Sequence, residues 1–398
     1  MGIYAVIVIN ITAILYIVFA VYTQKLGDCQ IELETGKIDN KIYTIINDNR
    51  AKFVFHVPIS ETGKKQLAMI IDCAARVQPE GSKYYGLNIN AKVNNLNNPR
   101  DDGYFEAIVM KKGSSMTIQI TLDIESPGRN IREVINRLNE IKVDFLYKYY
   151  CRNPIKNKRE VILLDPRDFK EAKLSELPPP VPAPEAKIPA DSRVIPVKTP
   201  LLVPGDNLSK IIKDLASPFL SPGSIVALAE SAVAITQGRI KYVEDIEPGF
   251  LARRLNKFFN EDSSLCSVYG MEMAIREAGA VRILIATITG ILGKLIGRSG
   301  DFYRVAGKDV ATIDDATGTI PPFDKFVVMG PKDPAGVVQK IKEDTGFDAA
   351  IVDVNDLRRV DVLAITDKKY KKLLEEALVD NPQGNACQQT PLLVIKTE

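Results

Sequence analysis

A hydrophobic run opens the chain. Residues 3–22 carry no charged side chain, and only Asn10 and Thr12 among them are clearly polar. About 20 apolar residues in a helix can cross a hydrocarbon core of roughly 30 Å. A cleaved signal peptide would have a basic start, a shorter apolar core and a small-residue cleavage site, and none of these is clear here. The pattern therefore predicts a single-pass signal anchor at residues 1–27, in contact with membrane lipid through residues 3–22.

The basic residues beside this run predict its orientation. None precedes it, whereas Lys25, Lys37, Lys41, Arg50 and Lys52 follow it. The cytoplasmic flanks of membrane helices carry an excess of Lys and Arg. The C-terminal domains are therefore expected in the cytoplasm.

Residues 28–172 contain short runs in which apolar and polar residues alternate and longer stretches with helical periodicity. This combination predicts a small α+β domain. The runs expected to form strands are residues 42–46, 52–59, 105–110, 116–122 and 161–164. Residue 60 could cap a helix that continues to residue 74, and apolar positions in residues 131–145 recur with a period near 3.6. No catalytic constellation is found in this domain, so a binding or assembly role is the default expectation.

Prolines then interrupt every regular pattern. They stand at Pro178, Pro179, Pro180, Pro182, Pro184, Pro189, Pro196, Pro200 and Pro204. Such a stretch favours extended polyproline II over helix or sheet interior. Residues 173–194 are therefore predicted to form a semi-rigid linker, and a ligand for an SH3-like groove is the alternative.

Along residues 195–398, strand-like apolar runs alternate with stretches of helical periodicity, which predicts a mixed α/β or α+β domain. Strands are expected at residues 225–229, 281–287, 325–329, 349–354, 360–365 and 392–395, and helices at 208–215, 333–345 and 367–379. Asn207 can cap the first helix, and Gly346 can end the second. Residues 281–296 are apolar enough to suggest a second membrane span. Arg282, Lys294 and two glycines favour a buried strand and turn instead.

Composition narrows the function classes. The chain has 398 residues, 45% of them hydrophobic, which is enough to bury cores and excludes disorder throughout. That length predicts about two or three domains. With 52 basic and 50 acidic residues the net charge is +2, so no overall field favours nucleic acid.

Cysteine and histidine usage removes further chemistry. The five cysteines are odd in number and form no CxxC pair, so neither a zinc ribbon nor a disulfide framework is indicated. Isolated thiols in a reducing compartment agree with a cytoplasmic location. His56 is the single histidine and lies in a strand-like run, where a structural position is the simpler interpretation. Carboxylates, amides and main-chain groups must carry any catalysis.

Acidic residues at the ends of expected strands are the best candidates for chemistry. Asp309, Asp314 and Asp315 form one group, and Asp353, Asn355 and Asp356 follow the hydrophobic strand at residues 349–354. Hard cations such as Mg²⁺ take oxygen ligands at such places. The alternative is ordinary turn and capping chemistry. The glycines at residues 290–294 lack the spacing of a P-loop.

Five ordered motifs make residues 196–396 resemble the coenzyme F(420)-0:L-glutamate (γ-glutamyl) ligase family, in particular its bacterial F(420)-ligase-like branch. They are residues 202–208, 229–239, 303–309, 351–356 and 381–391. The resemblance implies a ligase-like domain at residues 195–398. In the family, GTP phosphorylates a carboxylate, and the amine of glutamate then attacks the acyl phosphate to form an amide.

The resemblance also implies site residues. The metal-binding acids, for Mg²⁺ or Mn²⁺, fall on Asp309 and Asp353. Nucleotide-contacting positions fall on Thr199, Pro200, Leu201, Leu202, Glu230, Ser231, Thr312, Gly384, Gln389 and Thr390. A nucleotide and a small carboxylate substrate are the implied partners, nucleic acid is not expected, and a homodimer is left open.

Several positions depart from the family pattern. Val354 replaces a threonine beside the second metal acid, Thr312 replaces an asparagine, and Ile235 replaces a basic residue near the nucleotide. Loss of that positive charge weakens phosphate binding. Two hypotheses follow: a membrane-anchored amide ligase that uses metal and GTP, or a degenerate ligase-like domain that serves as a ligand-binding or assembly module.

Overall fold

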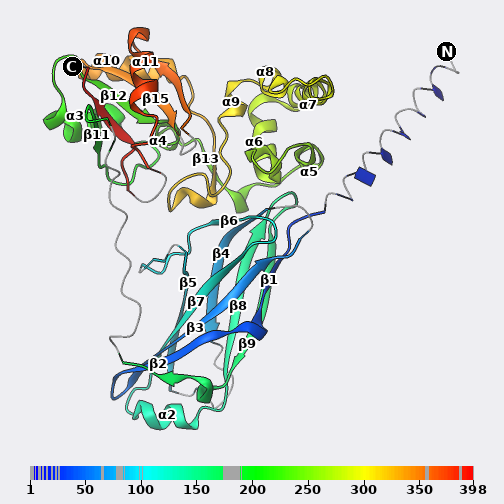
Figure 1. Ribbon diagram of the computed structural model, residues 1–398, viewed down its shortest axis with the longest axis vertical. Helices are drawn as coiled ribbons and strands as arrows, with labels where there is room; N and C mark the ends of the chain where they lie inside the picture. The colour runs from blue at the N-terminus through cyan, green and yellow to red at the C-terminus, as the bar shows by residue number, and fades with distance from the viewer. Residues whose placement is uncertain are drawn as a thin grey trace. The chain divides into compact units, whose positions relative to one another are not determined.

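A computed structural model describes residues 27–63, 67–77, 84, 86–97, 99–100, 102–173, 189, 191–354, 358–384 and 388–397, with scattered positions between 4 and 25. The chain forms two compact units. Unit 1 comprises Met1–Val181 and Asn256–Val268, and unit 2 comprises Pro182–Leu255 and Tyr269–Glu398. Each unit is described by itself (Figure 1).

Much of the expected anchor at residues 3–22, and most of the expected linker at residues 173–194, lies outside the described residues. Described positions of the anchor are helical, and the Asn10 amide donates to the Val6 carbonyl at 2.8 Å. Within the described part of the chain, no single helix is long and apolar enough to cross a membrane. One bent pair meets the criteria together, α6 (Val268–Ala278) and α7 (Ala280–Leu295), with a bend of 116°.

Unit 1 is built from two sheets. The first has the order β10-β2-β3-β7-β5, with β1 on β3, and the second has the order β6-β4-β8-β9. The strands are β1 (Ile31–Leu33), β2 (Asp39–Asn47), β3 (Arg50–Glu61), β4 (Ala68–Val77), β5 (Asn88–Asn95), β6 (Ile108–Met110), β7 (Ser115–Glu125), β8 (Ile141–Tyr150), β9 (Lys156–Leu164) and β10 (Lys170–Glu171). In β7 every second residue is buried, which is the pattern of a strand with one face on a core.

Two predicted helices of this unit are wrong. Residues 60–74 fall on the end of β3 and on β4, which pairs along its length with β8. Residues 131–145 form a helix only at α2 (Ile131–Arg137), after which the chain is extended from Leu138 and enters β8. The burial of β8 follows strand alternation over much of its length, so pairing with β4 and β9 overrides the helical spacing. The described part of residues 28–172 is therefore mainly β, with one α-helix.

Unit 2 centres on a five-stranded sheet of order β11-β17-β12-β15-β16. The strands are β11 (Val194–Val197), β12 (Ile225–Ala229), β15 (Asp348–Val354), β16 (Val360–Ile365) and β17 (Leu392–Ile395). α3 (Leu208–Ala216) and α10 (Pro334–Thr345) bury apolar residues on one face, and α11 (Lys371–Ala377) does so on the other. The predicted strands at 225–229, 349–354, 360–365 and 392–395 and the helices at 208–215 and 333–345 are confirmed.

The rest of unit 2 is largely helical. It includes α4 (Glu230–Thr236), α5 (Ala252–Leu255), α6, α7, α8 (Asp301–Ala306) and α9 (Lys308–Ala311), and a two-stranded sheet of β13 (Ile240–Tyr242) and β14 (Phe326–Val328). The predicted strand at residues 281–287 is wrong, because these residues lie in α7. A short apolar run fits a strand or a helix equally well when only a few residues are considered.

Residues 256–268 belong to unit 1 through contacts with the end of β8. The Asn256 amide donates to the Arg152 carbonyl at 2.8 Å, and the Val268 N–H donates to the Cys151 carbonyl at 3.0 Å. Cys29, Cys73, Cys151 and Cys266, the described cysteines, are buried and form no disulfide.

Candidate functional site

Four carboxylates gather near the carboxyl end of the central strands of unit 2. β12 and β15 run parallel, with Ala229 opposite Val352, so Glu230 and Asp353 emerge at the same edge of the sheet. Asp353 is paired with Asp361 across the antiparallel β15–β16 ladder. Asp314 is held by a β-bridge to Val328 and acts electrostatically on Glu230. Glu230, Asp314, Asp353 and Asp361 are called the acid cluster below.

The members of the acid cluster raise one another's pKa values. Partial burial, followed by Asp314, Asp353 and Asp361, raises the pKa of Glu230 to about 9. The surrounding protein, followed by Asp353 and Asp315, raises the pKa of Asp314 to about 7, although solvent reaches its side chain. Desolvation and Asp361 raise the pKa of Asp353. No lysine or arginine is among these causes, so desolvation and then the neighbouring negative charges set the pKa values at the site.

Thr312 and Gly330 form the surroundings of Glu230. A hydrogen bond with the Thr312 side chain lowers the pKa of Glu230 and so favours its ionised form. A Cβ atom at Gly330 would collide with the Thr312 hydroxyl and would lie 3.3 Å from Glu230 Oε1. Glycine is therefore required at this position to leave room for the two side chains.

The structure brings together the predicted nucleotide segments. The Thr199 N–H donates to the Gln389 carbonyl at 2.9 Å, which joins the segment at residues 199–202 to the late loop. The Ala229 N–H donates to the Pro391 carbonyl at 2.8 Å, which fixes that loop beside the start of α4. The Thr390 hydroxyl is buried and donates to the Gln383 carbonyl at 2.9 Å.

The exposure of the remaining predicted positions varies. Leu202 is buried, Leu201 and Ser231 are half-buried, and Pro200 is exposed. Gly384 adopts a φ of 72°, a backbone conformation that favours glycine. Residues 385–387 of the late loop lie outside the described residues.

The two predicted metal acids differ in their surroundings. Asp353 belongs to the acid cluster, whereas Asp309, on α9, is not among the acids that shift the pKa values there; both residues are exposed. Asn355 and Asp356 lie outside the described residues. Across the described residues, no group of three or more His, Cys, Asp or Glu side chains is arranged to hold a metal ion.

Asp361 was missed from the sequence, although Asp314 was named as a candidate. The available signal was its place between Val360 and Val362, at the start of a strand that forms a hairpin with β15. Asp353 and Asp361 lie opposite each other in the regular part of the hairpin, and the register shift between Val352 and Ile351 comes only beyond them.

Two arginines of unit 2 are paired with acids outside the cluster. Arg239 forms an ion pair with Glu277 at 2.9 Å and donates to the Gly330 carbonyl. Arg298 forms an ion pair with Asp301 at 3.3 Å.

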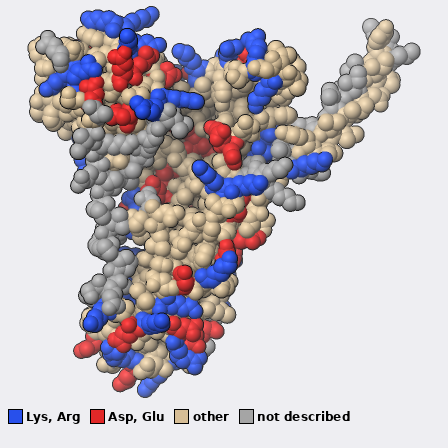
Figure 2. Space-filling model, in the orientation of Figure 1, with Lys and Arg blue, Asp and Glu red and all other residues tan. Residues whose placement is uncertain are grey.

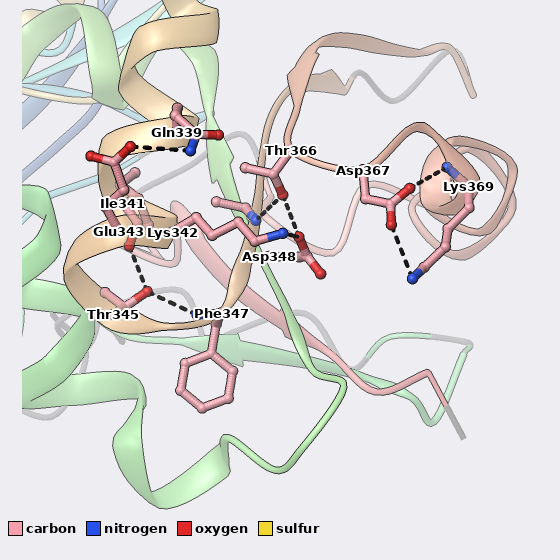
Figure 3. A network of polar contacts seen from close by, with 11 residues as sticks. Gln339, Ile341, Lys342, Glu343, Thr345, Phe347, Asp348, Thr366, Asp367 and Lys369 are labelled. Carbon is pink, nitrogen blue, oxygen red and sulfur yellow. Dashed lines mark hydrogen bonds and ion pairs between the residues drawn. The ribbon is translucent and has the colours of Figure 1, made fainter.

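At the other end of β15, the charge of Asp348 is compensated by neighbouring side chains. Asp348 accepts from Lys342 Nζ at 2.6 Å and from the Thr366 hydroxyl at 2.7 Å, and Thr366 in turn accepts from the Ala349 N–H at 3.0 Å (Figure 3). Partial burial alone would raise the pKa of Asp348, but Lys342 and Thr366 more than offset it, and the pKa is lowered. At the acid cluster near the carboxyl end of the same strand, the hydrogen bond with Thr312 only partly offsets the raised pKa of Glu230, and no lysine or arginine is among the causes.

A comparison with protein families gives a match in this half of the chain. Residues 196–359, which are 164 of the 398 residues, match the model of F(420)-0:gamma-glutamyl ligase. The match supports a ligase-like domain in the C-terminal half. The N-terminal half has no family match. The match covers β12, α4, Asp314 and Asp353, and it ends before Asp361 and the late loop.

Other comparisons say little about function. No curated protein matches the chain. Among solved structures, the GAE domain of yeast GGA1 is 14% identical, covers 34% of this chain and 91% of its own, and has a TM-score of 0.19. The putative ApaA protein from Bordetella pertussis is 8% identical, covers 35% of this chain and 94% of its own, and also scores 0.19. Scores at this level carry no argument.

Proposed function

We propose that the F(420)-0:gamma-glutamyl ligase-like domain is an amide ligase that binds a divalent cation and GTP at the acid cluster. Its substrates would be a small carboxylate and an amino acid. The observation that carries the proposal is the convergence of Glu230, Asp314, Asp353 and Asp361, where desolvation and then mutual repulsion raise the pKa values of three carboxyl groups. A bound cation would relieve this repulsion, and carboxylate oxygens are the ligands that Mg²⁺ and Mn²⁺ prefer.

The donor set fits a cation that arrives with a nucleotide. The described residues provide no ready cage of three or more ligands. Mg²⁺ is commonly held by one or two carboxylates, with phosphate oxygens and waters as its other ligands. One or two of Glu230, Asp314 and Asp353 would supply the carboxylates. The cation would stabilise negative charge on a phosphoryl group during its transfer.

The chain's own residues have definable tasks in this proposal. With a pKa of about 9, Glu230 holds a proton at neutral pH when no cation is near, and the hydrogen bond with Thr312 favours its ionised form. The hydrogen bond between Thr199 and Gln389 keeps the two nucleotide segments side by side. An anchor at residues 3–22, with the C-terminal domains in the cytoplasm, would hold this site near a membrane.

Calorimetry of the full chain in detergent tests the proposal, with GTP or ATP titrated in Mg²⁺ or Mn²⁺. We expect cation-dependent GTP binding that Asp353→Asn and Asp314→Asn each weaken at least tenfold, because a contact to a charged group contributes about 1.5–3 kcal/mol. Asp344→Asn is the control, since Asp344 is exposed on α10 in the same domain. Asp309→Asn measures the role that the family resemblance assigns to Asp309.

The alternative is a degenerate domain that binds a ligand or assembles with a partner without catalysis. It is favoured by Arg239 and Arg298, whose charges are committed to Glu277 and Asp301, and by Val354, which offers no side-chain oxygen. The absence of nucleotide binding by the folded protein, with either cation, would reject the ligase proposal and favour this alternative.

A further inference from the structure

Helix α7 turns its small residues toward the protein and most of its large apolar residues toward solvent, the reverse of a helix in a water-soluble domain. Its small residues face the protein: Cβ atoms at Gly290 and Gly293 would collide with Phe302 and Asp301 of α8. Ala286 is buried on the same helix. Ile283 is also buried, but most of the large aliphatic side chains of α7 are exposed, whereas in a soluble helix they form the core face.

The outward face of α7 is a continuous apolar surface. Its exposed members are Val281 (73%), Leu284 (42%), Ile285 (51%), Ile288 (51%), Leu292 (57%) and Leu295 (77%), and Ile296 (72%) follows directly. At 100° per residue these side chains and Ile291 span an arc of about 140°. From their exposures they present on the order of 700 Å² of apolar surface, more than the largest patch of a typical monomer. These side chains are called the α7 apolar face.

Basic residues border this face on both sides. By helical position, Arg282 and Lys294 lie about 120° to either side of its centre at Ile288. α7 contains no acidic residue. Beyond it, Arg298 and Arg304 share the single carboxylate of Asp301. In Figure 2 the surface at the place of α7 is mainly tan, with blue Lys and Arg atoms beside it.

We propose that the α7 apolar face lies on the surface of an anionic lipid bilayer. A helix that rests in a membrane interface has a wide apolar arc with Lys and Arg near its borders, where their long side chains reach the headgroups. Anionic headgroups would complement the positive charge around α7. This site is separate from the anchor expected at residues 3–22 and does not depend on the ligase reaction.

A second copy of the chain fits this face less well. In an antiparallel pair of α7 helices, Arg282 of one copy would approach Lys294 of the other. In a parallel pair each would approach its own counterpart. Either arrangement brings like charges together at the rim of an apolar contact, which is unfavourable.

The chain contains no tryptophan, so a single introduced tryptophan reports on α7 alone. The full chain with Ile288→Trp is reconstituted into vesicles of phosphatidylglycerol and phosphatidylcholine, with and without brominated acyl chains. We expect a blue-shifted emission and at least a twofold loss of intensity in brominated vesicles. Phe219→Trp is the control, because Phe219 is 40% exposed and lies outside α7, and we expect no quenching there.

The same measurement can overturn the proposal. Emission from Ile288→Trp that is unquenched by brominated lipid would reject it, whatever residues 1–27 do. Emission that is blue-shifted without vesicles and indifferent to brominated lipid would assign the α7 apolar face to a second copy.

Charge provides the second arm of the test. In the Ile288→Trp background, Arg282→Gln with Lys294→Gln should raise the phosphatidylglycerol fraction needed for half-maximal quenching by twofold or more, because each basic residue near an anionic surface adds to binding. Both replacements keep polar side chains of similar length, and Arg253→Gln on α5 is the matched control. Equal quenching in vesicles of pure phosphatidylcholine and in anionic vesicles would overturn the proposal.

Discussion

The crowding of the acid cluster predicts that unit 2 becomes less stable as pH rises. The pKa of Glu230 rises from its ordinary value of 4.5 to about 9 in the folded domain. Below pH 4.5 both the folded and the unfolded states hold the proton, and Glu230 has no net effect. Above that pH the unfolded chain releases the proton while the folded domain keeps it, so folding loses about 1.4 kcal/mol per pH unit until pH 9. At pH 7 the loss is about 3 kcal/mol.

Glu230→Gln removes this titration and keeps a side chain that can bond with Thr312. We expect the variant to be more stable than the wild type at pH 7 by up to about 3 kcal/mol and indistinguishable from it near pH 4.5. Hydrogen exchange of the β12 and β15 amides, read by mass spectrometry, measures the stability of unit 2 within the full chain. Mg²⁺ should stabilise the wild type most at high pH, because cation and proton compete for the same carboxylates.

Glu376→Gln is the matched control. Glu376 is 62% exposed and pairs with Lys372 at 3.7 Å, so its replacement should change stability by less than about 0.5 kcal/mol at every pH. The reasoning is refuted if wild-type protection of β12 and β15 stays level from pH 5 to pH 9. It is also refuted if Glu230→Gln lowers protection at pH 7.

Three further predictions concern single contacts. Asp348→Ala should lower the unfolding free energy of unit 2 by about 1–3 kcal/mol, because Lys342 and Thr366 lose their shared acceptor; unchanged protection of β15 would contradict this. Gly330→Ala should destabilise unit 2 by more than about 1 kcal/mol, because the added methyl group collides with Thr312, and it should abolish the stabilisation of unit 2 by Mg²⁺. Gly36→Ala is the control, because Gly36 has open space around it, and it should leave the stability of unit 2 unchanged. In a Cys387→Ser background, a thiol reagent should react only after unfolding with the four remaining cysteines, Cys29, Cys73, Cys151 and Cys266. All four are buried, and burial raises the pKa of Cys29. Rapid reaction of the folded protein would disprove this.

The sheet of unit 2 was predictable because its signals are local. Asn207 and Asp333 accept backbone hydrogen bonds at the starts of α3 and α10, and Gly346 ends α10 in a left-handed conformation. β12, β16 and β17 are short apolar or alternating runs with turn residues at their ends. Each of these features acts within a few residues, so no partner strand had to be known.

The errors in unit 1 and in α7 have a different cause. The apolar residues of β4 permit a helix or a strand, and its pairing with β8 decides between them. That pairing joins residues about 70 positions apart, which sequence periodicity does not reveal. In α7 the prediction assumed that an apolar run must be buried, whereas most of its large side chains are exposed. The run was recognised, but its environment was not.

In the candidate site, too, local features could be predicted from the sequence and non-local contacts could not. Asp353 could be predicted because it lies at the carboxyl end of a buried strand, and the family pattern marks it. The cluster around it could not, because Glu230, Asp314 and Asp361 reach Asp353 through a parallel strand pairing, an isolated bridge and an antiparallel strand pairing. Such non-local contacts depend on the finished fold.

The two ends of β15 together favour a ligand at the acid cluster over a chance collection of acids. Like charges directly opposite each other on a ladder, as Asp353 and Asp361 are, reduce stability. At Asp348 the same strand shows that this fold can neutralise an acid with a lysine and a threonine. No lysine or arginine enters the pKa values of Glu230, Asp314 and Asp353, the Thr312 hydrogen bond only partly offsets the shift of Glu230, and Arg239 is paired with Glu277. The folded domain therefore retains a cost that a bound cation would remove, which is the behaviour expected of a binding site.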